Sequence, residues 1–355
     1  MQRNKNSFLA VSGALVLLLV LFYVVGPGSD LASRDNNVPV SVHNAHGTVY
    51  ESETTDDFGV IKYTHTRLAA SSDLLWLTIT YDNTSWGHNP EPDNSIRCVH
   101  DLLNIISAQH DVEKTSLGLL TSSMDEYHQY KEAVTEYAFA RVTIFMHTGF
   151  NDGPTVAREH RHDGDVQTLR RAEISKLRNY LMLQTLREEA HIVWLDADVF
   201  RLDDGIVDRI LRHVRARDDI GIITARCSLG GMYNYDLNAW RGTREGPRGW
   251  DLDQKEIDAG EMDLQGQYHV DKLIKDTSDD DLLALDTVGA TLLYLRASLI
   301  WRGLNFPHQY VVGTRWMKDG WDGIESEGLC YRARGLKGGK CMVLGGRWHV
   351  EHTTD

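Results

Sequence analysis

The chain has 355 residues, with 37 basic and 51 acidic side chains, so its formal net charge is −14. Hydrophobic residues make up 42% and charged residues 25% of the sequence. This composition is ordinary for a globular protein and excludes collagen-like, coiled-coil and wholly disordered chains. The acidic balance also argues against a nucleic-acid partner.

An uncharged apolar segment lies near the N-terminus, over residues 8–25. As a helix rising about 1.5 Å per residue it would span about 27 Å, close to the roughly 30 Å hydrocarbon core of a membrane. We therefore expect a cytosolic tail over residues 1–7 and a single transmembrane signal-anchor over residues 8–26. Arg3 and Lys5 precede the segment, so the positive-inside rule predicts a type II protein with its remainder in the lumen. A cleaved signal peptide is the alternative, but its apolar region usually has about 7–15 residues.

The segment over residues 27–72 is polar and irregular, which predicts a stem between the membrane and the folded part. Within it, residues 59–63 are a candidate strand of the folded part. Asn83-Thr84-Ser85 is an acceptor triplet for N-glycosylation. Four cysteines in an oxidising compartment allow either two bridges or four buried thiols, and both remain open. They are Cys98, Cys227, Cys330 and Cys341.

From residue 73 onward, short apolar runs alternate with helical segments, which predicts one α/β domain over residues 73–355. The helices are expected over residues 94–110 and 166–190, and the second carries Arg171 and Arg178 two turns apart on one face. Ligands of α/β sheets collect at the carboxyl ends of strands. The buried strands are expected over residues 74–81, 116–121, 142–146, 191–195 and 220–224.

An acidic pair, Asp196 and Asp198, directly follows the apolar run at residues 191–195. Two carboxylates separated by one residue can reach one divalent cation, and hard oxygen ligands suit magnesium or manganese. Such a metal neutralises charge when a diphosphate leaves a sugar. Two similar acidic patterns, at residues 251–253 and 279–281, lie in polar stretches and are expected to be loops.

Several stretches, taken in order, resemble the fungal Golgi mannosyltransferases that form the α-1,6-mannan polymerase complexes. The resemblance covers roughly residues 74–355 and the type II anchor. It is carried by the following stretches: SLGLLTSS at residues 116–123, VQTLRRAEISKLRNYL at 166–181, WLDADV at 194–199, YDLNAW at 235–240, LDTVGATLLYL at 285–295, GLNFP at 303–307, IESEGL at 324–329 and VEH at 350–352.

The resemblance implies a GT-A-type fold that binds a nucleotide-diphosphosugar, with GDP-mannose as donor and related subunits as partners. Asp196 and Asp198 would then hold Mn²⁺ on the donor diphosphate. His352 matches the C-terminal histidine that completes the metal site in this family, and His349 is the alternative. The acceptor would be mannan or another N-glycan, and the enzyme would reside in the Golgi membrane.

The resemblance gives looser roles to other polar residues. Thr78, Thr80 and Asp82 match the segment that usually holds the guanosine. A donor-facing role for the helix arginines competes with a salt-bridged helix surface. For the glutamates near residue 326 the alternative is capping of a helix over residues 328–334. The expected donor-binding residues are Arg170, Arg171, Arg178, Asp236 and Asn238, and the expected catalytic residues are Glu327, Asp286 and Glu325.

Since GDP-mannose and the expected linkage are both α, transfer would retain configuration. No carboxylate pair stands out as nucleophile and acid, as in retaining glycosidases, so we expect front-face attack with the leaving diphosphate accepting the proton. Two other functions compete. One is a non-catalytic subunit that stabilises an active partner. The other is a haloacid-dehalogenase-like phosphatase, which also has D-x-D after a strand but usually Thr or Val where Phe200 stands.

Overall fold

The computed structural model describes residues 40–44, 47–68, 70–147, 164–242, 268–309, 311 and 323–353. The expected cytosolic tail and signal-anchor lie outside these residues, as does the acidic pattern at residues 251–253. Within the described part, no helix is long and apolar enough to cross a membrane.

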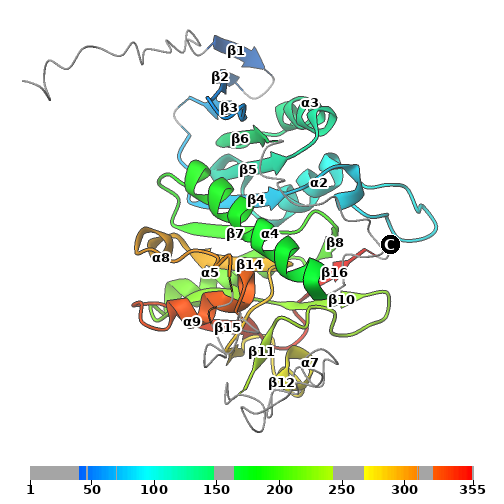
Figure 1. The fold of residues 1–355 in the computed structure, drawn as a ribbon, viewed down its shortest axis with the longest axis vertical. Coiled ribbons are helices and arrows are strands. Elements are labelled where there is room, and N and C mark those ends of the chain that lie inside the picture. Colours follow the sequence, from blue (N-terminus) through cyan, green and yellow to red (C-terminus); the bar gives the residue numbers. More distant parts are fainter. Residues whose placement is uncertain are drawn as a thin grey trace, which may run out of the picture. The chain divides into compact units, whose positions relative to one another are not determined.

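Within the described residues, eleven strands form the main sheet, in the order β1-β2-β3-β6-β5-β4-β7-β14-β9-β15-β13. Figure 1 shows the part of the sheet from β1 to β7. A three-stranded sheet, β10-β16-β8, and a two-stranded sheet, β11-β12, accompany it. The strands of the main sheet are β1 (Val40–Asn44), β2 (Gly47–Thr55), β3 (Ile61–Arg67), β4 (Leu74–Ile79), β5 (Thr115–Thr121), β6 (Arg141–Met146), β7 (His191–Leu195), β9 (Ile220–Thr224), β13 (Leu282–Ala284), β14 (Leu292–Arg296) and β15 (Lys340–Leu344). The smaller sheets contain β8 (Val199–Leu202), β10 (Arg226–Leu229), β11 (Trp240–Arg241), β12 (Tyr268–His269) and β16 (His349–His352).

The centre of the main sheet is parallel, because β6, β5, β4 and β7 all run in one direction. Strand β14 interrupts this pattern and is antiparallel to both of its neighbours, β7 and β9. The first residues of β14 therefore lie at the same edge of the sheet as the last residues of β7. This edge is where ligands of α/β sheets usually bind.

Helices cover both faces of the main sheet, and alternate strand residues enter two different cores. On one face Leu74 and Trp76 pack with α2, α3 and α5, and on the other Leu75 and Leu77 pack with α4, α8 and α9. Burial on both faces explains why these strands are continuous apolar runs. The helices are α2 (Val99–Gln109), α3 (Met124–Ala133), α4 (Gly164–Thr185), α5 (Ile206–Ala216), α7 (Val270–Leu273), α8 (Ala297–Trp301) and α9 (Leu329–Ala333).

The apolar runs predicted five strands, and all five are present as β4, β5, β6, β7 and β9, the last two with the predicted bounds. Both predicted helices are shorter than expected. Helix α2 begins at Val99 because the Asp101 carboxylate accepts a hydrogen bond from the Cys98 amide at 2.8 Å and caps it. Helix α4 ends at Thr185, after which the Glu189 carboxylate accepts a hydrogen bond from the Arg187 amide at 2.8 Å.

The structure differs from the expected stem over residues 27–72. Strands β1, β2 and β3 continue the main sheet through antiparallel pairing, with β3 hydrogen-bonded to β6. The compact unit therefore begins at residue 39 rather than at residue 73. In β2 and β3 only Val49, Tyr63 and His65 are buried, and most other positions are threonine, serine or charged. A strand with one wet face does not need an apolar run, so the polar composition concealed it.

The cysteines follow neither of the two expected arrangements. Cys330 in α9 and Cys341 in β15 form a disulfide, with their Cα atoms 5.8 Å apart, whereas Cys98 and Cys227 are free. Both predicted arrangements are therefore wrong. A bridge requires Cα atoms within about 7 Å. The packing of α9 on β15 brings one pair that close, and the spacing of the cysteines in the sequence does not indicate this packing.

Candidate active site

The acidic pair lies at the edge where β7 ends and β14 begins. The Asp196 amide donates to the Thr291 carbonyl at 3.1 Å, which anchors the end of β7 to the residue before β14. The Val199 amide then donates to the Asp196 carbonyl at 3.3 Å, so the chain turns sharply into β8. Asp196 and Asp198 therefore lie on a fixed turn at the carboxyl end of a buried strand, as the sequence predicts.

His352 reaches this turn from the far end of the chain. Strand β16 lies between β10 and β8, in a register that pairs His352 with Val199. The His352 Nε2 atom lies 3.0 Å from Asp198 Oδ2, and the Thr353 amide donates to the Asp198 carbonyl at 2.9 Å. Burial lowers the pKa of His352, but the hydrogen bond and charge of Asp198 outweigh it and raise that pKa to about 9.

Asp196 faces helix α4, where Arg178 Nη2 donates to its Oδ1 at 2.8 Å. Burial raises the pKa of Asp196 to about 7 even though Arg178 lowers it, and the nearby carboxylates Asp198 and Glu325 add to the rise. Three carboxylates thus lie beside two cationic groups, Arg178 and His352. The remaining negative charge favours a bound cation.

Arg178 is the centre of this charge cluster and is 4% exposed. Its guanidinium lies over the rings of Trp194 and Phe306, at 5.2 and 5.6 Å from their centroids, and its Nε is 3.1 Å from Glu325 Oε1. The Nη1 atom is buried without a hydrogen-bond partner among the described residues. The two aromatic rings fix the plane of the Arg178 guanidinium, which is thereby positioned to contact both Asp196 and Glu325.

Glu325 and Glu327 lie on the short 3-10 helix Glu325–Gly328, beside α4. Glu325 is 7% exposed and has a positive φ of 57°, which is a strained conformation for a residue with a side chain. Glu327 Oε2 lies 3.1 Å from Arg171 Nη2, which also donates to the Ile324 carbonyl at 3.2 Å. The two glutamates thus pair with two arginines that lie two helical turns apart. These arginines form salt bridges, as the alternative expected, and a donor-facing role stays a prediction.

A metal ion fits the chemistry of Asp196, Asp198 and His352, since two carboxylates and one imidazole are ligands that manganese accepts. Among the described residues, however, no three His, Cys, Asp or Glu side chains are already spaced as metal ligands. Asp198 contacts His352, and Asp196 contacts Arg178. His349, the alternative ligand, contacts Asp203 at 2.9 Å and Glu351 at 3.1 Å. Of the two histidines, His352 contacts the acidic pair.

Asp236 and Asn238 lie in the loop after β10. Asp236 accepts a hydrogen bond from the Asn238 amide at 3.1 Å and one from the Thr291 hydroxyl at 3.3 Å, and burial raises its pKa. A Cβ atom on Gly289 would lie 1.6 Å from Asp236 Oδ2, so only glycine fits there. Asp236 therefore ties this loop to the residue before β14, next to Asp196.

Sequence reasoning missed Tyr235 and Cys227 in this neighbourhood. The Tyr235 ring centroid lies 4.7 Å from that of His352, and the Tyr235 amide donates to the Cys227 carbonyl at 2.8 Å. Burial raises the pKa of the Cys227 thiol, and Asp196 and Asp198 contribute to the same shift. The YDLNAW stretch contained the signal for Tyr235, but nothing indicated that its ring packs on a histidine from the end of the chain.

The predicted guanosine segment at the end of β4 is mostly engaged in internal contacts. Thr78 donates to the Leu195 carbonyl at 2.9 Å, and Thr80 donates to Glu126 Oε2 at 2.8 Å. Asp82 caps the short 3-10 helix Asn83–Ser85 by accepting a hydrogen bond from the Thr84 amide at 2.9 Å. The glycosylation triplet is this short helix, and Asn83 is exposed. Donor binding by these residues stays a prediction.

Two of the predicted site residues, Asp286 and Arg170, have no contact with the cluster around Arg178 among the described residues. Asp286 accepts a hydrogen bond from the Gly242 amide at 2.9 Å, lies 3.8 Å from Arg334, and lines a pocket beside the Cys330–Cys341 disulfide. Arg170 is exposed on α4, and its charge reaches Tyr235, whose pKa burial raises and Arg170 lowers. The structure therefore brings Arg178, Glu325, Asp196, Asp198 and His352 together, with Asp286 lining another pocket.

Comparison with known sequences identifies one family. The sequence model of the Anp1 family matches residues 78–309. The chain is 23% identical over 226 residues to the mannan polymerase complex subunit mnn9 of Schizosaccharomyces pombe, covering 58% of this chain and 64% of the relative. It is 26% identical over 190 residues to the vanadate resistance protein of Candida albicans, covering 48% and 39%. The matched region spans less than two thirds of either relative's length.

The solved structures found by comparison have little sequence identity to the chain. A crystal structure of residues 1–349 of TarS from S. aureus is 12% identical, with a TM-score of 0.43 over 79% of this chain and 60% of that one. A 4-diphosphocytidyl-2C-methyl-D-erythritol synthase from Anaerococcus prevotii is 10% identical, with a TM-score of 0.37 over 79% and 88%.

Proposed function

Because the chain belongs to the Anp1 family, we propose that it is a metal-dependent retaining mannosyltransferase that transfers mannose from GDP-mannose to an α-mannoside acceptor of N-linked glycans. The acceptor would be the α-1,6-mannan backbone. One observation carries the proposal: the turn after β7 and the end of β16 bring Asp196, Asp198 and His352 to one edge of a mixed α/β sheet. A cation held there would stabilise the negative charge on a departing sugar diphosphate.

Asp196, Asp198 and His352 would hold Mn²⁺. When bound, the metal neutralises the charge that develops on the departing diphosphate. Arg178 holds Asp196 in place from inside the protein and keeps the turn ordered. The Thr353 amide fixes the backbone of Asp198 at 2.9 Å, so the ligand-bearing turn and β16 move as one unit.

The pairing of the carboxylates supports front-face attack. Glu325 contacts Arg178 and Ser326, Glu327 contacts Arg171, and Asp236 holds its own loop. A double-displacement nucleophile would need a carboxylate free to form a bond with the sugar. We therefore assign Glu325 and Glu327 to positioning the arginines, and the proton of the acceptor hydroxyl to the leaving diphosphate. A covalent mannosyl-enzyme found by mass spectrometry would refute this route.

The setting of the enzyme is part of the proposal. A type II anchor over residues 8–26 would place the catalytic part in the Golgi lumen, and one relative is named as a mannan polymerase complex subunit. We infer that this chain also works with related subunits.

The decisive experiment uses the full chain, solubilised with its apolar segment, together with manganese, GDP-mannose and an α-mannoside acceptor. We expect transfer to fall at least about a hundredfold in Asp198→Asn, because removing a charge-stabilising contact to the transition state costs about 3 kcal/mol or more. Chelation should abolish transfer, and added manganese should restore it.

Asp218→Asn is the matched control, because Asp218 is exposed and lies 3.8 Å from Lys337. It should transfer as the wild type does. Unchanged activity in Asp198→Asn, or activity that survives chelation, would refute the metal mechanism.

The second candidate is a non-catalytic subunit, since the Schizosaccharomyces pombe relative is named as a subunit of a complex. The single chain would then be inactive, and adding a related subunit would restore transfer equally to the wild type and to Asp198→Asn. The phosphatase alternative is not supported by the family match.

A further inference from the structure

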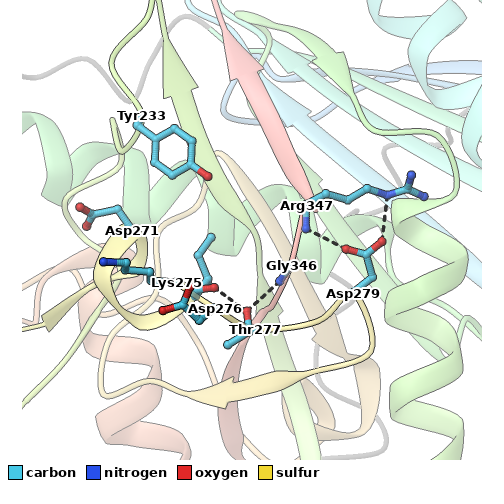
Figure 2. Close-up of a pocket in the computed structure, with 9 residues that line it drawn as sticks. Tyr233, Asp271, Lys275, Asp276, Thr277, Asp279, Gly346 and Arg347 are labelled. Atoms are coloured by element: carbon cyan, nitrogen blue, oxygen red, sulfur yellow. Dashed lines mark hydrogen bonds and ion pairs between the residues drawn. The ribbon is translucent and has the colours of Figure 1, made fainter.

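A second pocket lies beside the small sheets, with a volume of about 500 Å³. Figure 2 shows Tyr233 and Asp271 on one side of it and Gly346, Arg347 and Asp279 on the other. The remaining lining residues are Ile274, Lys275, Asp276 and Thr277. These residues come from the loop after β10, from α7 and the turn that follows it, and from the turn before β16.

Most of the charged side chains that line this pocket are not paired with one another. Arg347 Nε lies 3.2 Å from Asp279 Oδ2, and its guanidinium lies 4.9 Å from the ring centroid of Trp348. Within the described part of the chain, Asp271, Lys275 and Asp276 have no hydrogen-bonded or ion-paired side-chain partner. Among the lining side chains three carboxylates face two cations, and the Arg226 guanidinium behind the Tyr233 ring is a third cation. The pocket is therefore close to neutral, which suits an uncharged ligand. Free carboxylates and an ammonium group suit the hydroxyl groups of a neutral ligand.

Tyr233 provides an aromatic surface for such a ligand. It is 60% exposed, and the guanidinium of Arg226 lies 3.6 Å from its ring centroid. Arg226 is only 6% exposed, and its Nε and Nη1 atoms are buried with no hydrogen-bond partner among the described residues. The arginine therefore supports the ring from within the protein and leaves the ring partly open to a ligand.

The turn at the bottom of the pocket is fixed before any ligand binds. Thr277 donates to the Ile274 carbonyl at 2.6 Å and accepts a hydrogen bond from the Gly346 amide at 2.9 Å. Asp276 is held at a φ of 62°, which is a strained conformation for a residue with a side chain. A rigid pocket with polar groups already in place loses less entropy when it binds a ligand.

The same two chain segments connect this pocket to the candidate active site. Tyr233 is two residues from Tyr235, whose ring contacts His352. Arg347 is five residues before His352. At roughly 3.3 Å per extended residue five residues span at most about 16 Å. The separation is shorter here because residues 346–347 form a turn. An oligosaccharide of a few units is long enough to reach both sites.

We propose that this pocket binds hexose units of the acceptor glycan remote from the reacting hydroxyl. The Tyr233 ring packs against the C–H face of a sugar, and Asp271, Lys275 and Asp276 bind its hydroxyl groups. The proposal rests on the function given above, because it assigns the ligand to the acceptor side of the same enzyme. It makes the chain selective for long acceptors.

Binding without turnover tests the proposal. The full chain is titrated calorimetrically with a neutral α-linked mannohexaose and with mannobiose, in the absence of donor and manganese. Tyr233→Ala should weaken hexaose binding by about tenfold, the effect of losing one aromatic contact of about 1.4 kcal/mol. Asp271→Asn should weaken it less, and the preference for hexaose over mannobiose should shrink in both variants.

Tyr331→Ala is the matched control, because Tyr331 is 46% exposed and also lies beneath an arginine, Arg334, but outside this pocket. It should bind hexaose as the wild type does. Undetectable hexaose binding by the wild type, equal binding by Tyr233→Ala, or competition by inorganic phosphate would each overturn the proposal. Transfer by Asp198→Asn is measured separately, so failure of the catalytic proposal and failure of the acceptor pocket give different results.

Discussion

The cluster around Arg178 and the pocket beside Tyr233 differ in how their charges are paired. In the cluster, Asp196 and Glu325 share Arg178, Glu327 pairs with Arg171, and Asp198 contacts His352. In the pocket, three charged side chains have no side-chain partner within the described residues, although Arg347 and Asp279 pair at its rim. Paired charges hold the protein in shape, whereas unpaired charges on a fixed turn are available for a ligand. Substitutions should therefore affect stability in the first region and leave it almost unchanged in the second.

The largest loss of stability is expected for Arg178→Met. Removing the guanidinium leaves Asp196 and Glu325 close together without a cation, and breaking a buried pair in this way costs about 3 kcal/mol or more. Urea unfolding of the metal-free protein measures it. Arg215→Met is the control, since Arg215 is 59% exposed and lies 3.4 Å from the half-exposed Asp73. An exposed pair contributes at most about 1 kcal/mol. Equal losses in the two variants would mean that the cluster does not stabilise the fold.

A smaller loss, of about 2 kcal/mol, is expected for Glu126→Gln. The buried Glu126 carboxylate accepts hydrogen bonds from Trp86 Nε1 at 2.5 Å, Thr121 at 2.5 Å, Thr80 at 2.8 Å and Tyr130 at 3.3 Å. A glutamine amide would place donors where hydroxyl groups now donate. Thermal unfolding measures the loss, and Glu132→Gln, exposed on the same helix, should leave the melting temperature unchanged. Around Glu126, neutral donors rather than arginines compensate the buried charge.

In the pocket, Asp276→Gly should have the smallest effect and the opposite sign. Glycine adopts a φ of 62° without strain, so we expect a gain of about 0.5 kcal/mol in the free energy of unfolding. Asp271→Gly, in α7, should instead lose about 0.5–1 kcal/mol. Chemical denaturation of both variants measures whether the free energy of unfolding rises or falls. A clear loss in Asp276→Gly would mean that its carboxylate stabilises the turn, which contradicts the assignment to ligand binding.

The buried half of the fold could be predicted from the sequence, because parallel strands covered on both faces are apolar throughout. Strands β7 and β9 have the predicted bounds for this reason. Strands β2 and β3 are largely polar and contain many threonines, so local composition did not separate them from a stem. The position of Asp196 and Asp198 after a strand could also be predicted, because these residues directly follow the apolar run in the sequence.

The contacts that organise the candidate site are not local. Arg178 was predicted to face the donor, yet its partners, Glu325 in a 3-10 helix and Asp196 after β7, depend on how α4 packs across the sheet. Thr80 was expected to hold a nucleotide, but its hydroxyl donates to Glu126 from another element. The ring contact between Tyr235 and His352 joins the loop after β10 to strand β16, which the sequence did not predict.

The pairing of β3 with β6 has a practical consequence for producing the protein. A fragment cut at residue 73, the boundary that the sequence suggests, would lack β1 to β3 and would leave β6 as an unprotected edge. Five of the six residues of β6 are buried, so the cut would expose both unpaired backbone groups and apolar side chains to neighbouring molecules. Long apolar edges of this kind recruit other chains and aggregate. Soluble expression should therefore begin no later than β1.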